Sequence, residues 1–165
     1  INMANQHHNE TLRQLVKKKG VGASMGKHLD DEELTSLKDI FHSEQANQTT
    51  KATLLTAILT LDTTKDEQAW IDAVKKSPSK FLPTKLMDFL PKAEIKYHKN
   101  KNEIDFLTTI KKVISGKDLK KNEFKTYFDY CFDTSIPDYL KAAFLEAERL
   151  KRETFDENMA CLELL

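Results

Sequence analysis

The 165-residue sequence contains little glycine and little proline, with four residues of each. Loops that cradle phosphates need clustered glycines, because the backbone amides must approach the phosphate closely. Only residues 20–26 hold more than one glycine in a short stretch. Charged residues make up 32% of the chain and interrupt the apolar residues every few positions. This composition disfavours turn-rich structure and favours helices.

Cysteine, long apolar runs and net charge are also scarce. Cys131 and Cys161 lie far apart and form no metal-ligand motif, so we expect buried reduced thiols. No apolar run approaches the roughly 20 residues that cross a bilayer, and INMANQHHNE lacks the apolar core of a signal peptide. Both features predict a cytoplasmic protein without a membrane partner. The formal net charge is zero, so no overall field attracts nucleic acid.

Helical spacing of apolar residues organises the first part of the chain. It predicts a helix at about 9–19, followed by three helices that include residues 34–41, 54–61 and 70–74. Asp30 with Glu33, and Thr64 with Glu67, have the spacing of capping boxes at two helix starts. Residues 47–50 offer hydroxyl caps to the helix between them.

Two prolines and a lysine-rich stretch mark residues 77–101 as a linker that holds a short helix around 84–90. Helical spacing then resumes, and Gly116 is placed to end a helix as its C′ residue. Later helices are expected near 119–133, 136–151 and 155–165, the last capped by Thr154 and Glu157. The predicted fold is all-α, with two related four-helix units in tandem, 1–76 and 102–165, joined by the linker.

An internal repeat supports this division into two units. Residues 26–74 align without a gap on residues 116–164, and 12 of the 49 positions are identical. About three identities are expected at ordinary composition. The matches fall at the start of the second helix, on the third helix and in the capping box of the fourth. The alternative explanation is that caps and small core residues recur at these positions in many helical bundles. The preserved spacing of all three elements favours duplication.

The second unit, VISGKDLKKNEFKTYFDYCFDTSIPDYLKAAFLEAERLKRET, resembles the N-terminal helical domain of the anthranilate phosphoribosyltransferase and nucleoside phosphorylase family. The resemblance covers about 55 residues. It rests on Gly116 to Leu119, Ala142 to Leu145 and Arg149 to Thr154. Arg152 departs from the family pattern, which has glycine there. The first unit is a weaker match, carried by Gly26, Lys27 and Leu29 and by Leu54 to Ala57.

The resemblance implies a helical domain that builds a dimer contact and one wall of a substrate cleft. In this family the chemistry lies in a separate α/β domain, which has a glycine-rich phosphate loop and an acidic pair for magnesium and phosphoribosyl pyrophosphate. No stretch of this sequence contains those motifs. We therefore predict a non-catalytic interaction module with no catalytic residue, cofactor or metal. The alternative is a fragment of a phosphoribosyltransferase-like or glycosyltransferase-like enzyme.

Two helices, at 50–61 and 137–151, are expected to present an apolar face for association. The candidate interface residues are Leu54, Ile58, Leu61 and Phe144. The expected partner is a second copy of the chain or an α/β catalytic domain.

Three other candidate sites are less well supported, because their residues do not have the spacing of a known motif or have a structural explanation. GVGASMGKH differs from a nucleotide-binding P-loop, because its outer glycines are one residue too far apart and His28 replaces the hydroxyl residue. The five histidines show no metal-ligand spacing and are expected at the surface. Lys17, Lys18, Lys19 and Lys27 could neutralise phosphates, which keeps nucleic-acid binding as an alternative function. Helix ends rich in lysine also arise from the helix dipole.

Overall fold

The computed structural model describes residues 14, 29–44, 47–60 and 64–151. Within these ranges the chain forms eight helices and no strand, which confirms the predicted all-α fold. None of the described helices is long and apolar enough to span a membrane. The helices are α2 (Asp31–His42), α3 (Gln48–Thr60), α4 (Lys65–Lys76), α5 (Pro78–Phe81), α6 (Thr84–Met87), α7 (Lys101–Ile114), α8 (Lys121–Tyr130) and α9 (Asp138–Leu150). Apart from residue 14, which is helical, the predicted helix at 9–19 lies outside the described residues, as do the predicted helix at 155–165 and the box of Thr154 and Glu157.

The two capping boxes in the first part of the chain are confirmed. At α2, the Asp30 carboxylate accepts a hydrogen bond from the Glu33 amide at 2.9 Å, and the Asp30 amide donates to Glu33 at 3.0 Å. At α4, Thr64 and Glu67 exchange the same pair of bonds, each 3.2 Å long. Each box therefore satisfies two backbone amides that the helix itself leaves without an acceptor. The buried Glu67 also accepts from the Leu29 amide at 3.3 Å, which ties the start of α2 to α4.

The start of α3 differs from the expected hydroxyl cap. The side-chain oxygen of Asn47 accepts from the Thr49 amide at 2.8 Å, so the cap is a carboxamide. Inside the helix, the Thr53 hydroxyl donates to the carbonyl of Thr49 at 2.8 Å. Threonine inside a helix commonly bonds the carbonyl one turn back.

Helix α7 is limited at both ends by residues outside its apolar stripe. The Asn100 side chain accepts from the amides of Asn102 at 2.9 Å and Glu103 at 3.2 Å. Gly116 has a φ of +94°, the conformation that a C′ residue needs and that glycine adopts without strain. The predicted role of Gly116 is confirmed, whereas the Asn100 cap was not anticipated.

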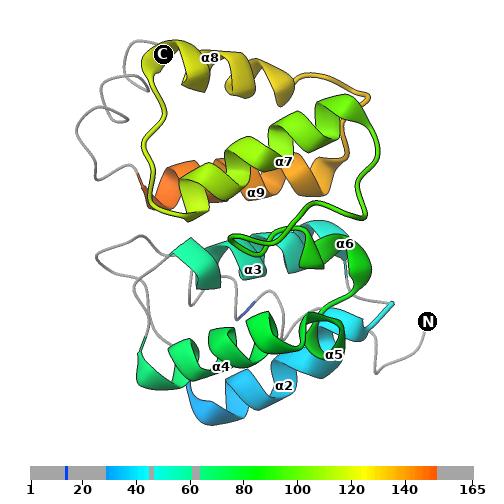
Figure 1. The fold of residues 1–165 in the computed structure, drawn as a ribbon, viewed down its shortest axis with the longest axis vertical. Coiled ribbons are helices and arrows are strands. Elements are labelled where there is room, and N and C mark those ends of the chain that lie inside the picture. The colour runs from blue at the N-terminus through cyan, green and yellow to red at the C-terminus, as the bar shows by residue number, and fades with distance from the viewer. Residues whose placement is uncertain (1–13, 15–28, 45–46, 61–63, 152–165) are drawn as a thin grey trace.

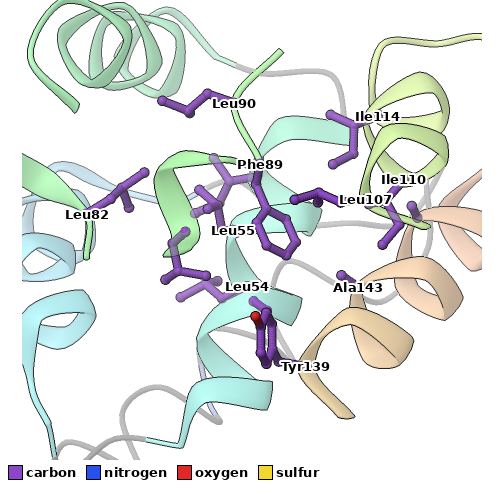
Figure 2. Packing of buried hydrophobic residues seen from close by; sticks show 14 of the residues in the cluster. Leu54, Leu55, Leu82, Phe89, Leu90, Leu107, Ile110, Ile114, Tyr139 and Ala143 are labelled. Atoms are coloured by element: carbon purple, nitrogen blue, oxygen red, sulfur yellow. The ribbon is translucent and has the colours of Figure 1, made fainter. Parts of the chain in front are cut away.

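The segment 77–101 contains two short helices, α5 and α6, where one helix was predicted. Pro78 begins α5, because its fixed φ suits a first helical position and its missing amide is not needed there. The segment also contributes four fully or almost fully buried side chains to the core: Leu82, Leu86, Phe89 and Leu90. Figure 2 shows Phe89 beside Leu55 of α3, and all four residues belong to the same core cluster as Leu55, so the segment packs on α3 as well as linking α4 to α7.

The two predicted units share one hydrophobic core. Buried side chains from Leu29 in the first unit to Ala147 in the second belong to a single cluster. Helices α3 and α9 form the most extensive contact between any two described helices. Figure 1 shows them side by side across the middle of the molecule, with α2 and α4 on one side and α7 and α8 on the other.

Candidate functional site

The predicted association face lies inside the molecule. Leu54, Ile58 and Phe144 are each 0% exposed. They are buried because α3 packs on α9 and the rest of the core closes around both helices. This corrects the expectation that both helices present these side chains outward. Leu61 lies outside the described residues, as do Lys17, Lys18, Lys19 and Lys27 of the nucleic-acid alternative.

The most elaborate polar cluster in the described residues joins Asp88, His98 and Tyr139. One carboxylate oxygen of Asp88 accepts from the Lys96 amide at 2.9 Å. The other accepts from the amides of Tyr97 at 2.8 Å and His98 at 3.0 Å, and lies 2.8 Å from His98 Nδ1. His98 Nε2 lies 2.6 Å from the Tyr139 hydroxyl. The cluster thus links the end of α6, the loop before α7 and the start of α9.

Burial and hydrogen bonding set the protonation of this cluster. Burial acts to raise the pKa of Asp88, but hydrogen bonds from His98 and from the Lys96 and Tyr97 amides outweigh it and hold the pKa below its usual value. Burial raises the pKa of Tyr139 to about 12, and the charges of Glu103 and Asp88 add to the rise. Asp88 is therefore a carboxylate and Tyr139 a neutral phenol at neutral pH.

A carboxylate can only accept hydrogen bonds, so His98 Nδ1 donates to Asp88. A neutral His98 ring then accepts from the Tyr139 hydroxyl through Nε2, and every polar atom of the chain of bonds has a partner. Each of the three residues is at most 7% exposed, and the hydrogen bonds between them already engage the Asp88 carboxylate and both His98 ring nitrogens. The arrangement therefore fixes the position of the loop on α9, which is a structural role.

The placement of His98 corrects the expectation of surface histidines. It is 3% exposed, because both ring nitrogens are satisfied and the ring packs 5.9 Å from that of Tyr139. Sequence spacing gave no sign of the cluster, since Tyr139 is 41 residues away. The one local signal was Asp88 next to a hydrophobic run with no helix start to cap.

The surface of the described part of the molecule includes two grooves that combine apolar and charged residues. A groove of about 580 Å³ lies between α2, α4 and α5, and its lining includes Trp70, Phe81, Lys38 and Asp66. A second, of about 240 Å³, is lined by the loop after α6, including Met87 and Tyr97. Both are open to solvent.

No group of three or more metal-ligating side chains occurs within the ranges that the structure describes. Cys131 is a free thiol, and burial raises its pKa to about 11 although the Lys141 charge acts in the other direction. A thiol with that pKa is almost entirely protonated at neutral pH, so it is a weak nucleophile. Cys161 lies outside the described residues.

The fold is a helical bundle, and its buried polar cluster of Asp88, His98 and Tyr139 holds the loop before α7 against α9. Comparison with protein families identifies the particular bundle: residues 107–165 match the glycosyl transferase family, helical bundle domain. For residues 107–165 this match confirms the resemblance of the second unit to the helical N-terminal domain of the anthranilate phosphoribosyltransferase type of protein, and it does not extend to the first unit. Comparison with curated proteins found no match, and comparison with solved structures found none.

Proposed function

We propose that the chain is a non-catalytic helical interaction module. The observation that carries the proposal is the match of residues 107–165 to a helical bundle domain. The family resemblance implies that the chemistry of such proteins lies in a separate α/β domain. The chemistry of the described residues supports it, because Asp88, His98 and Tyr139 are all engaged in holding the loop before α7 against α9.

The partner that we propose is an α/β domain, or a second copy of the chain, approached through the outer surface. Leu54, Ile58 and Phe144 are unavailable to it because they lie in the core. Among the described large hydrophobic residues, Phe132 is 73% exposed and Leu145 is 45% exposed. Both belong to the matched region, so they are the side chains through which we expect docking.

Turnover of phosphoribosyl pyrophosphate tests the absence of catalysis. The purified chain, incubated with magnesium and phosphoribosyl pyrophosphate in the presence of anthranilate or a nucleobase, is expected to release no pyrophosphate. Release above that of a heat-denatured sample would reject the non-catalytic module.

The match equally favours a second candidate, in which the chain is a fragment of a phosphoribosyltransferase-like enzyme. This candidate predicts that the chain increases the activity of a separately supplied α/β phosphoribosyltransferase domain. Phe132→Ser and Leu145→Ser should weaken that effect if docking uses these residues. Asp129→Asn, an exposed change on α8, is the matched control and should leave the effect unchanged.

A further inference from the structure

Helices α3 and α9 occupy equivalent places in the chain. Both ends of α9, Asp138 and Leu150, lie 90 residues after the ends of α3. The starts of α2 and α8, at Asp31 and Lys121, are separated by the same 90 residues. This is the spacing at which 12 of 49 residues are identical. The helix bounds therefore share the offset of the sequence repeat.

Burial shows the same offset. Leu29 and Leu119, which precede the two related helix starts, are 3% and 2% exposed. Glu33 and Glu123 each accept a hydrogen bond from the backbone amide three residues earlier, at 3.0 and 3.2 Å. The local structure at the start of each pair of helices is thus the same in its buried residue and in its capping bond.

The two equivalent helices are in contact with each other, and both bury several equivalent positions. Leu54 and Phe144, Ala57 and Ala147, and Ile58 and Glu148 are buried pairs related by 90 residues. In each helix these positions have the spacing of three and four residues that defines one face. Figure 1 shows α3 and α9 running in the same direction across the middle of the molecule.

Contact between copies of one surface is the defining property of a two-fold interface, in which residue i contacts j and j contacts i. We propose that the chain is an intramolecular pseudo-dimer, in which α3 and α9 are two copies of one self-complementary surface paired within a single chain. The partner of this surface is the other half of the same chain. A second copy of the protein therefore does not bind there, and the outer surface remains for the docking of an α/β domain or a second copy.

The proposal makes a specific prediction about contacts. Ala57 of α3 and Leu150 of α9 form a small buried cluster. Position 150 is equivalent to position 60, and position 57 is equivalent to position 147. Two-fold packing therefore requires Thr60 and Ala147 to be neighbours as well.

Disulfide trapping in the full chain tests this symmetry. In a background of Cys131→Ala and Cys161→Ala, one variant carries Ala57→Cys with Leu150→Cys, and a second carries Thr60→Cys with Ala147→Cys. Both are expected to form a disulfide within one chain under mild oxidation. They should migrate as compact monomers on a non-reducing gel, at every protein concentration. Ala57→Cys with Leu145→Cys is the matched control, and it should stay reduced because Leu145 is on the exposed side of α9.

Several outcomes would overturn the pseudo-dimer. A disulfide in the first variant without one in the second shows packing that lacks two-fold symmetry. If neither variant forms a disulfide, the proposed contact between α3 and α9 is wrong. Ala57→Cys alone is a small change that tests the interface if a double variant misfolds: a disulfide-linked dimer of this single variant shows that α3 meets a second copy. Helical circular dichroism before oxidation establishes folding. None of these results depends on whether the chain turns over phosphoribosyl pyrophosphate, so this inference and the proposed function can fail separately.

Discussion

Thr56 lies in the middle of α3 with its side chain fully buried, and its hydroxyl has no hydrogen-bond partner among the described residues. A buried polar group without a partner costs about 1–3 kcal/mol. Thr56→Val keeps the shape of the side chain and removes the hydroxyl. We expect it to raise the free energy of unfolding by about 1 kcal/mol, measured by urea denaturation.

Thr53→Val is the matched control for this change, one turn earlier in the same helix. The Thr53 hydroxyl donates to the Thr49 carbonyl at 2.8 Å, so its removal should bring no gain. A loss of stability in Thr56→Val would contradict the prediction and would indicate a partner for that hydroxyl.

The Asp88 carboxylate accepts hydrogen bonds from three backbone amides and from the His98 ring. In Asp88→Asn, the amide group of the new side chain would face backbone amides or His98, all of which are donors. We expect a loss of about 2–3 kcal/mol in the free energy of unfolding at neutral pH, because hydrogen bonds to a charged acceptor are lost and buried donors are left unpaired. Urea denaturation measures it, and Asp129→Asn at an exposed position should change little.

The effect of Asp88→Asn should depend on pH. The folded-state pKa of Asp88 lies below its usual value, so the carboxylate stabilises the fold above the unfolded-state pKa of about 4. That stabilisation is lost as the pH falls through the folded-state pKa. The difference between the two proteins should therefore shrink in acid, and a constant difference would contradict the assigned charge.

Sequence reasoning identified which individual residues cap helices and missed those that meet over long distances. Asp30 with Glu33 and Thr64 with Glu67 are three residues apart, so the spacing alone sets their geometry. His98 and Tyr139 meet only after α7 and α8 have folded between them. No local pattern encodes such a contact, and the default expectation of an exposed histidine was wrong.

The end of α7 depends on one glycine. Gly116 has a positive φ, and a side chain added there would meet nothing within 4 Å. The cost of Gly116→Ala is therefore backbone strain alone, which we expect to be about 1 kcal/mol in the free energy of unfolding. Thermal or urea denaturation measures it.

Gly116→Asn provides the comparison, because asparagine tolerates the left-handed conformation better than alanine. Its loss should be the smaller of the two. Equal losses of unfolding free energy in the two variants would contradict the view that glycine is needed here for its left-handed backbone conformation.

At the level of helices, the predictions were best for long, periodic segments and poorest for the short ones. Helices α7 and α9 have clear apolar stripes and α3 is buried on most of its sides, whereas α5 and α6 have four residues each. Four residues are too few to show a period, and Pro78 suggested a break in the helical pattern although it is suited to the first position of a helix. The buried role of Leu82 to Leu90 was missed for the same reason.

The arrangement of the helices shows that the apolar face predicted from the sequence is covered within the chain. Periodicity correctly indicated that Leu54, Ile58 and Phe144 lie on apolar helix faces. It could not show what covers those faces, because a contact within the chain and a contact with a partner bury the same residues. All three belong to the core cluster that includes residues of the other helices, so other parts of this chain cover them; Figure 2 shows this for Leu54.

A single core that spans both halves should make them unfold together. The chain's one tryptophan, Trp70, lies in the first half, and its four tyrosines lie between residues 97 and 139. Trp70 fluorescence and tyrosine near-ultraviolet circular dichroism therefore report on different halves of the same molecule. Coincident transitions seen by different probes are the mark of a cooperative unit.

Urea unfolding monitored simultaneously by these two signals is the most direct measurement. The α3–α9 core predicts one transition with the same midpoint and the same slope for tryptophan and tyrosine. Two transitions at different urea concentrations would show that the halves fold independently, and would contradict a core shared through α3 and α9.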